Sequence, residues 1–181
     1  ASKKFSVCID CLSGLNLEPV VDLLSQPDRY WILHSARQDL EVIYGLKKQL
    51  LKKIFDTQIA AGFIGLPWPL SLTKTIYTIL NHDVGGHFTF SQWDERPLTK
   101  RQIHYAADDV RYLLAIYDYL SKELTSLDRA NWVLEECSKF TSKEAYKFNI
   151  AKVIKKICGN KNPKNKELKK IQSIAILRNG I

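Results

Sequence analysis

Residues 30–42 read YWILHSARQDLEV, and this stretch decides the fold class. Its first four residues are aromatic and aliphatic without alternation, which is typical of a strand that is buried on both faces. Polar residues follow at once, and Ser35 can cap a helix over about residues 37–51. A buried strand that leads directly into a helix indicates an α/β domain.

The flanking segments continue this alternation. A strand is expected at residues 5–9 and another at 54–55, and the helices are expected at 17–25, 57–63 (capped by Asp56), 72–80 and 100–124 (capped by Thr99). Further helices are expected at 128–140, 148–157 and 166–177, without strands between them. The sequence therefore predicts an α/β domain at 1–127, a helical extension at 128–160, and a linker with one more helix at 161–181.

The composition is that of a globular protein with a basic surface. The chain has 181 residues, of which 45% are hydrophobic and 25% charged, and its formal net charge is +8. It lacks a run of ~18 apolar residues, so no membrane span is expected. A basic surface favours a polyanionic partner such as nucleic acid. Much of the lysine lies after Lys139, where a solvated tail and a nucleic-acid contact both remain open.

The four cysteines include a pair, Cys8 and Cys11, with the spacing of a redox or zinc motif. Zinc would need two further ligands, and no second close Cys/His pair follows in the sequence. Cys8 lies in an apolar run, where cysteine is usually a small buried hydrophobe. Structural cysteines and a reducing cytoplasm are therefore expected.

Two groups of acids could support chemistry. Tyr105 and Asp109 are four residues apart on a predicted helix and share a face, whereas Asp108 points elsewhere and is expected to be a surface acid. Asp39 falls in the first turn of the helix after the buried strand, where ligands bind in open α/β sheets. Taken alone, these residues are better explained as helix-capping or surface acids.

Five stretches together resemble the ribonuclease D branch of the DEDD exonuclease superfamily. Residues 105–114, YAADDVRYLL, are similar to the third exonuclease motif in its Tyr-x-x-x-Asp variant, and residues 34–42 are similar to the second motif. The other three stretches are 55–58 (FDTQ), 93–99 (WDERPLT) and 134–137 (LEEC). Their collinear order carries the resemblance, which covers about residues 5–140.

The resemblance implies a ribonuclease H-like exonuclease fold, a mixed sheet flanked by helices, with an all-helical C-terminal extension. It also implies that Asp39 and Asp109 bind metal, within a site for two Mg²⁺ or Mn²⁺ ions, and that Tyr105 orients the attacking water. The implied reaction is 3′→5′ hydrolysis of RNA, with tRNA precursors among the substrates and nucleoside 5′-monophosphates as products.

The sequence departs from the family pattern at its front. The first motif of the family is Asp-x-Glu, and the sequence contains this pattern only at residues 39–41, which already match the second motif. The fold is therefore expected to be incomplete at the N-terminus, with a complementing N-terminal segment or chain as a partner. Because two carboxylates are lacking, the chain alone is expected to be inactive or nearly so.

Two further departures follow. The family commonly has Asp-Lys where this chain has Gly85-Gly86, and His87 is a weak substitute for that lysine. Residues 166–181 resemble only the first helix of the nucleic-acid-binding domain that often follows in this family. Two functions remain open: an exonuclease of which this chain is a part, and a non-catalytic RNA-binding or interaction module derived from such a nuclease.

Overall fold

The computed structural model describes residues 6–85, 91–146, 149–159 and 163–178. The chain divides into two compact units, residues 1–145 and residues 146–181. None of the helices in the described ranges is both long and apolar enough to cross a bilayer.

Two parallel strands form the sheet in the described part of the first unit. β1 (Tyr30–Leu33) pairs with β2 (Lys53–Asp56), so that Tyr30 lies opposite Lys53 and Leu33 lies opposite Asp56. α2 (Arg37–Lys47) makes the crossover between them. A parallel pair needs such a crossover, and the observed order confirms the α/β class expected from residues 30–42.

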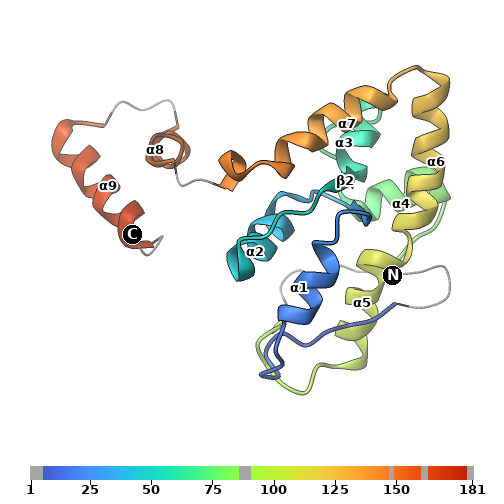
Figure 1. Cartoon of the computed structure of the whole chain (residues 1–181), viewed down its shortest axis with the longest axis horizontal. Helices are drawn as coiled ribbons and strands as arrows, with labels where there is room; N and C mark the ends of the chain where they lie inside the picture. Colours follow the sequence, from blue (N-terminus) through green and yellow to red (C-terminus); the bar gives the residue numbers. More distant parts are fainter. Residues whose placement is uncertain (1–5, 86–90, 147–148, 160–162, 179–181) are drawn as a thin grey trace. The chain divides into compact units, whose positions relative to one another are not determined.

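Helices pack around this sheet (Figure 1). α7 lies along β2, α6 contacts β1, and α3 lies against both α6 and α7. The bounds of the remaining elements in this unit are α1 Glu18–Leu24, α3 Thr57–Phe63, α4 Leu72–Leu80, α5 Lys100–Arg111, α6 Leu113–Ser126, α7 Ala130–Ser138 and the short 3₁₀ turn η1 Lys139–Thr141.

The core lies between β2 and helices α3, α4, α6 and α7. Its fully buried residues include Ile76, Ile116 and Leu120. Phe55 of β2 meets Tyr117 of α6 edge-on, with ring centroids 4.8 Å apart. Apolar burial is the main favourable term in folding, so this contact fixes α6 against the sheet.

The Asp56 carboxylate connects the two strand-to-helix junctions. It is 2% exposed and accepts hydrogen bonds from the backbone N–H groups of Gln58 (2.8 Å) and Ile59 (3.4 Å), which caps α3 as predicted. It also accepts from the N–H groups of Ser35 (3.0 Å) and Ala36 (2.8 Å), at the start of α2. One buried carboxylate therefore sets where both helices begin.

The His34 side chain makes a second link at the same edge of the sheet. Its Nδ1 lies 2.9 Å from Thr57 Oγ1, and its Nε2 lies 3.0 Å from the Leu70 carbonyl oxygen. Burial lowers the pKa of His34 below its ordinary value. The end of β1 is thus tied to the start of α3 and to the segment that leads into α4.

Several local predictions were wrong. The long helix expected at 100–124 is two helices, α5 and α6, which change direction at Tyr112. Ser35 does not cap α2, because it adopts a left-handed conformation (φ 57°) and Ala36 is the N-cap residue. Residues 6–9 form no strand, and Cys8 and Cys11 are exposed free thiols rather than buried ones. β1 is half-exposed rather than buried on both faces.

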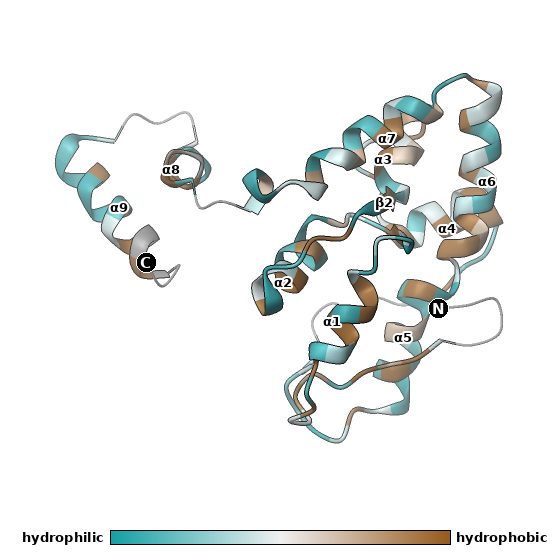
Figure 2. Cartoon of the chain, in the orientation of Figure 1, coloured by the Kyte–Doolittle hydropathy of each residue, from teal (hydrophilic) through white to brown (hydrophobic). Residues whose placement is uncertain are grey.

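The second unit contains two described helices, α8 (Ile150–Cys158) and α9 (Asn165–Arg178), which pack against each other. The first turns of α9 are hydrophilic (Figure 2). Exposed apolar side chains remain on both helices, including Ile157 on α8 and Ile174 on α9. The domain borders expected at residues 127 and 160 stay predictions.

We expect Asp56→Ala to lower the free energy of unfolding by about 3 kcal/mol or more, because backbone N–H groups at two helix starts lose their buried acceptor. Ser71→Ala is the matched control, since Ser71 caps α4 through a single exposed hydrogen bond to the Lys74 N–H. That variant should lose only about 1 kcal/mol. Urea unfolding followed by circular dichroism measures both losses, and equal losses would contradict the linking role of Asp56.

Candidate active site

Asp39 lies in the first turn of α2, just after β1. The bonds from Ser35 and Ala36 to Asp56 fix where this helix starts, and so they fix where Asp39 sits. One side of Asp39 faces solvent. Partial burial, and then the negative charge of Asp56, raise the pKa of Asp39 above its ordinary value.

Tyr105 and Asp109 lie one turn apart on α5, as their spacing predicts. A capping box at Thr99 and Gln102 sets the start of this helix: Gln102 N–H donates to Thr99 Oγ1 (3.2 Å), and Thr99 N–H donates to Gln102 Oε1 (2.8 Å). The N-cap at Thr99 was predicted from the sequence. The capping box fixes the residue at which α5 begins. It therefore also fixes the helical turn on which Tyr105 and Asp109 lie.

The charge of Asp39 on α2 affects the pKa of Asp109 on α5. Burial raises the pKa of Asp109 above its ordinary value, and the charges of Asp108 and then of Asp39 raise it further. A charge on Asp39 that raises the pKa of Asp109 places the two carboxylates within electrostatic range of each other. The fold thus brings Asp39 into the neighbourhood of Asp109, although 70 residues of sequence separate them.

A small cavity lies beside Tyr105 and Asp109, and Asp39 is not among the residues that line it. Tyr105 and Asp109 line it together with Asp108, and its other walls come from α4 and the segment after it: Leu72, Thr73, Ile76, Val84 and Gly85. Asp108 is half-buried and pairs with Arg111 at 2.8 Å, so its charge is already balanced. Tyr105 and Asp109 are therefore the members of this cluster that can act on a substrate.

The donor set fits a divalent cation only in part. Carboxylate oxygens are the ligands that hard cations such as Mg²⁺ prefer, and two such groups lie near each other here. Within the described ranges, no group of three or more His, Cys, Asp or Glu side chains is placed to hold a metal. Asp39 and Asp109 could therefore contribute to a metal site, but they do not complete one.

The ring of Trp93 is a neighbour that the sequence reasoning missed. Its centroid lies 6.0 Å from that of Tyr105, with the planes tilted by 48°. Trp93 belongs to the WDERPLT stretch, and the family resemblance of that stretch was the signal that could have pointed to it. His87, considered as a substitute for a missing lysine, falls outside the described residues.

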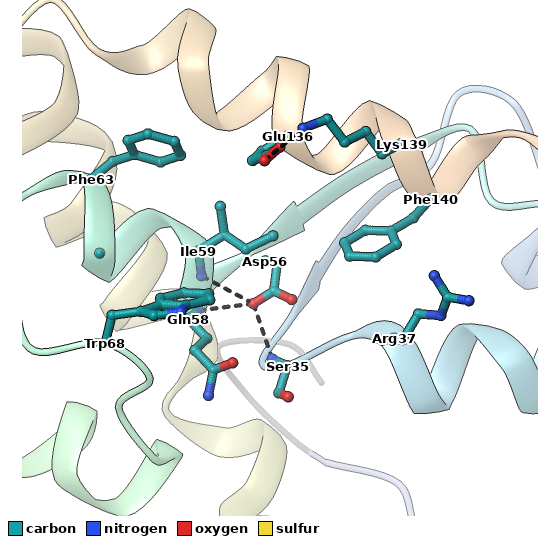
Figure 3. Close-up of a pocket in the computed structure, with 11 residues that line it drawn as sticks. Ser35, Arg37, Asp56, Gln58, Ile59, Phe63, Trp68, Glu136, Lys139 and Phe140 are labelled. Carbon is teal, nitrogen blue, oxygen red and sulfur yellow. Dashed lines mark hydrogen bonds and ion pairs between the residues drawn. The ribbon is translucent and has the colours of Figure 1, made fainter. Parts of the chain in front are cut away.

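A larger cavity of about 690 Å³ lies elsewhere, around Asp56 (Figure 3). Phe63 and Trp68 lie on one side of it, and Phe140 and Arg37 lie on the other. Its acids are already engaged, since Asp56 accepts backbone N–H bonds and Glu136 pairs with Lys139. It contains none of the three candidate residues, so the larger cavity is not where we place the chemistry.

Comparison with known proteins gives the family. The family model described as "3′-5′ exonuclease" matches residues 3–125. Ribonuclease D of Jannaschia sp. is 37% identical over 142 residues, covering 78% of this chain and 37% of that protein. Ribonuclease D of Bartonella henselae is 32% identical over 179 residues, covering 98% of this chain and 44% of that protein. The chain thus spans less than half the length of these relatives.

Solved structures agree. The structure of Escherichia coli RNase D, described as an exoribonuclease involved in structured RNA processing, aligns with a TM-score of 0.73 and 27% identity, covering 91% of this chain and 44% of that one. Brucella melitensis NrnC aligns with a TM-score of 0.63 and 26% identity, covering 70% of this chain and 61% of that one. The α/β, ribonuclease H-like fold is therefore confirmed, and the chain belongs to the 3′-5′ exonuclease family, on its ribonuclease D branch.

Proposed function

We propose that this chain is the part of a ribonuclease D-type 3′→5′ exoribonuclease that supplies Asp39, Tyr105 and Asp109 to the active site. The observation that carries the proposal is that Tyr105 and Asp109, one turn apart on α5, line the same small cavity in a chain of the 3′-5′ exonuclease family. The charge of Asp39 on α2 adds to the raised pKa of Asp109, which supports a place for Asp39 at the same site.

The proposed chemistry is metal-assisted hydrolysis at an RNA 3′ end. Asp39 and Asp109 would each provide oxygen ligands to Mg²⁺ or Mn²⁺. When bound in the complete enzyme, two such ions supply an activated water and stabilise the leaving 3′ oxygen. The phenol of Tyr105 would orient that water by hydrogen bonding, and the product would be a nucleoside 5′-monophosphate.

The described residues supply too little negative charge for two ions. Two Mg²⁺ carry four positive charges, whereas Asp39 and Asp109 provide two negative ones. We therefore infer that an Asp-x-Glu segment must complement this chain, and that without it metal binding and activity are weak.

The chain alone, incubated with Mn²⁺ and a 3′-labelled RNA, should trim nearly none of that RNA.

The function is tested by adding that segment. The region of Bartonella henselae ribonuclease D that precedes its match to this chain is fused in front of residue 1. The chimera should release nucleoside 5′-monophosphates from the 3′ end of RNA in Mn²⁺. Asp39→Asn, Asp109→Asn or Tyr105→Phe should each lower the rate by at least about 100-fold, because each removes a ligand or the water-orienting phenol.

Two results would count against this function. One is a folded chimera that is inactive, and the other is activity that is indifferent to Asp39 and Asp109. The first result would favour the alternative, a non-catalytic RNA-binding module derived from this family. Asp22→Asn is the matched control: Asp22 is exposed, pairs with Lys47 and lies outside the small cavity, so this variant should retain most of the activity.

The charge distribution supports RNA as the partner. Residues 146–181 contain ten basic residues and one acidic residue, a net charge of +9. Residues 1–145 contain 17 basic and 18 acidic residues, a net charge of −1. The net positive charge of the chain thus comes from the second unit, and we assign sequence-independent binding to phosphates to that unit. Within this proposal, tRNA precursors in the cytoplasm are the expected substrates.

We expect RNA affinity to depend on salt through these lysines. Lys155, Lys156, Lys169 and Lys170 are exposed on α8 and α9. Replacing all four by Gln should lessen the slope of log K against log salt for single-stranded RNA by about 3, because each lost phosphate contact removes about 0.7. Fluorescence anisotropy across a KCl series measures the slope. Four Gln substitutions at Lys52, Lys74, Lys100 and Lys122 of the first unit are the control, and an equal change there would contradict the assignment.

The raised pKa values of Asp39 and Asp109 predict a stability effect without metal. A raised folded-state pKa means that the ionised form is disfavoured in the fold, so each ionised carboxylate destabilises the metal-free protein at neutral pH. Asp109→Asn should therefore raise the melting temperature at pH 7, and the gain should vanish as the pH falls below the ordinary value of 3.8. Thermal unfolding in EDTA across pH measures this, and a gain that grows in acid would be the wrong sign.

A further inference from the structure

Arg96 and Asp10 join two loops that are far apart in the sequence. Arg96 Nε donates to Asp10 Oδ2 at 2.7 Å, and Arg96 Nη2 donates to Asp10 Oδ1 at 2.6 Å, which is a bidentate pair. Arg96 Nη1 also donates to the carbonyl oxygens of Trp93 and Glu95, both at 2.8 Å. The guanidinium thus hydrogen-bonds to its own loop and to Asp10 at the same time.

This pair fixes geometry more than it adds stability. The two side chains are 32% and 33% exposed, and ion pairs in contact with water contribute little free energy. The hydrogen bonds from Arg96, more than its charge, lower the pKa of Asp10 to about 2. A planar guanidinium with several donors in use holds one orientation, which lysine cannot reproduce.

The other end of the same loop is fixed by α5. The Gln102 side chain is buried, and its Nε2 donates to Ser91 Oγ (2.8 Å) and to the Gln92 carbonyl oxygen (3.1 Å). Residues 91–96 are therefore held at both ends, by Gln102 at the start and by Arg96 at the close. Trp93 lies between these two anchors.

Trp93 links the loop at residues 91–96 to the candidate site. Its indole lies 6.0 Å from the Tyr105 ring, and Tyr105 lines the small cavity together with Asp109. Aromatic rings at this separation and tilt attract each other and restrict each other's rotation. A shift of the loop at Trp93 would therefore change the packing of the Tyr105 ring.

We propose that Arg96, held by Asp10, is a positioning residue that fixes Trp93 against Tyr105 and so keeps the Tyr105 phenol beside Asp109. The catalytic consequence rests on the function proposed above, whereas the structural part does not. The clamp formed by Asp10 and Arg96 thus extends the active site to two residues that contact neither of the aspartates assigned to metal.

The structural part is tested in the 181-residue chain by fluorine NMR after labelling with 5-fluorotryptophan, with Trp93→Phe identifying the Trp93 resonance. Asp10→Asn and Arg96→Lys should each move that resonance by more than its linewidth, and Tyr105→Phe should move it as well. Asp22→Asn is the matched control, since it breaks a similarly exposed pair, Asp22 with Lys47 at 2.6 Å. A Trp93 resonance that stays in place in Asp10→Asn and Arg96→Lys overturns the proposal.

The catalytic part is tested in the chimera. Asp10→Asn should lower kcat about 10- to 100-fold with KM changed less than twofold, because a misplaced group affects the reaction more than the binding. Asp10→Asn combined with Tyr105→Phe should be no slower than Tyr105→Phe alone, since both act through the phenol. Additive losses, or an unchanged kcat, overturn the positioning role. An inactive chimera would overturn the proposed function instead, and the fluorine spectra would still decide the clamp.

Discussion

The arrangement of the first unit depends on one buried carboxylate. Asp56 ends β2, and its oxygens accept backbone N–H bonds from the starts of α2 and α3. Without these bonds, four N–H groups at the carboxyl edge of a small sheet would lie without an acceptor. Asp39 follows Ala36 by three residues, so the anchor that stabilises the fold also determines where the candidate ligand stands.

Asp39 and Asp109 differ from Asp56 in how their carboxylates are surrounded. Asp56 accepts hydrogen bonds from four backbone N–H groups, whereas partial burial raises the pKa of both Asp39 and Asp109, and the charge of Asp39 adds to the shift of Asp109. Ionised carboxylates in such surroundings cost stability, and a nearby cation would offset that cost. Asp56 thus has a structural role, whereas Asp39 and Asp109 are the acids that we propose as metal ligands.

Much of the fold could be predicted from local patterns. We could predict from residues that are neighbours in the sequence the β1–α2 junction, the Asp56 and Thr99 caps and the placement of Tyr105 and Asp109 one turn apart on a helix. The break at Tyr112 could not be predicted, because the apolar positions continue in register through it and local spacing holds no signal for the end of α5. The left-handed conformation of Ser35 could not be predicted either. Its N–H donates to Asp56, which lies 21 residues away in the sequence.

The contacts that prediction missed are the long-range polar ones, and they carry the argument for Arg96. Asp10 and Arg96 are 86 residues apart, and nothing in either segment alone selects the other as its partner. The WDERPLT stretch was informative only as a family likeness. In the structure its parts take separate physical roles: the guanidinium of Arg96 holds the loop, and the indole of Trp93 packs near the ring of Tyr105. A short motif can therefore shape a reaction that its own side chains do not perform, because it determines how freely the adjacent reactive group moves.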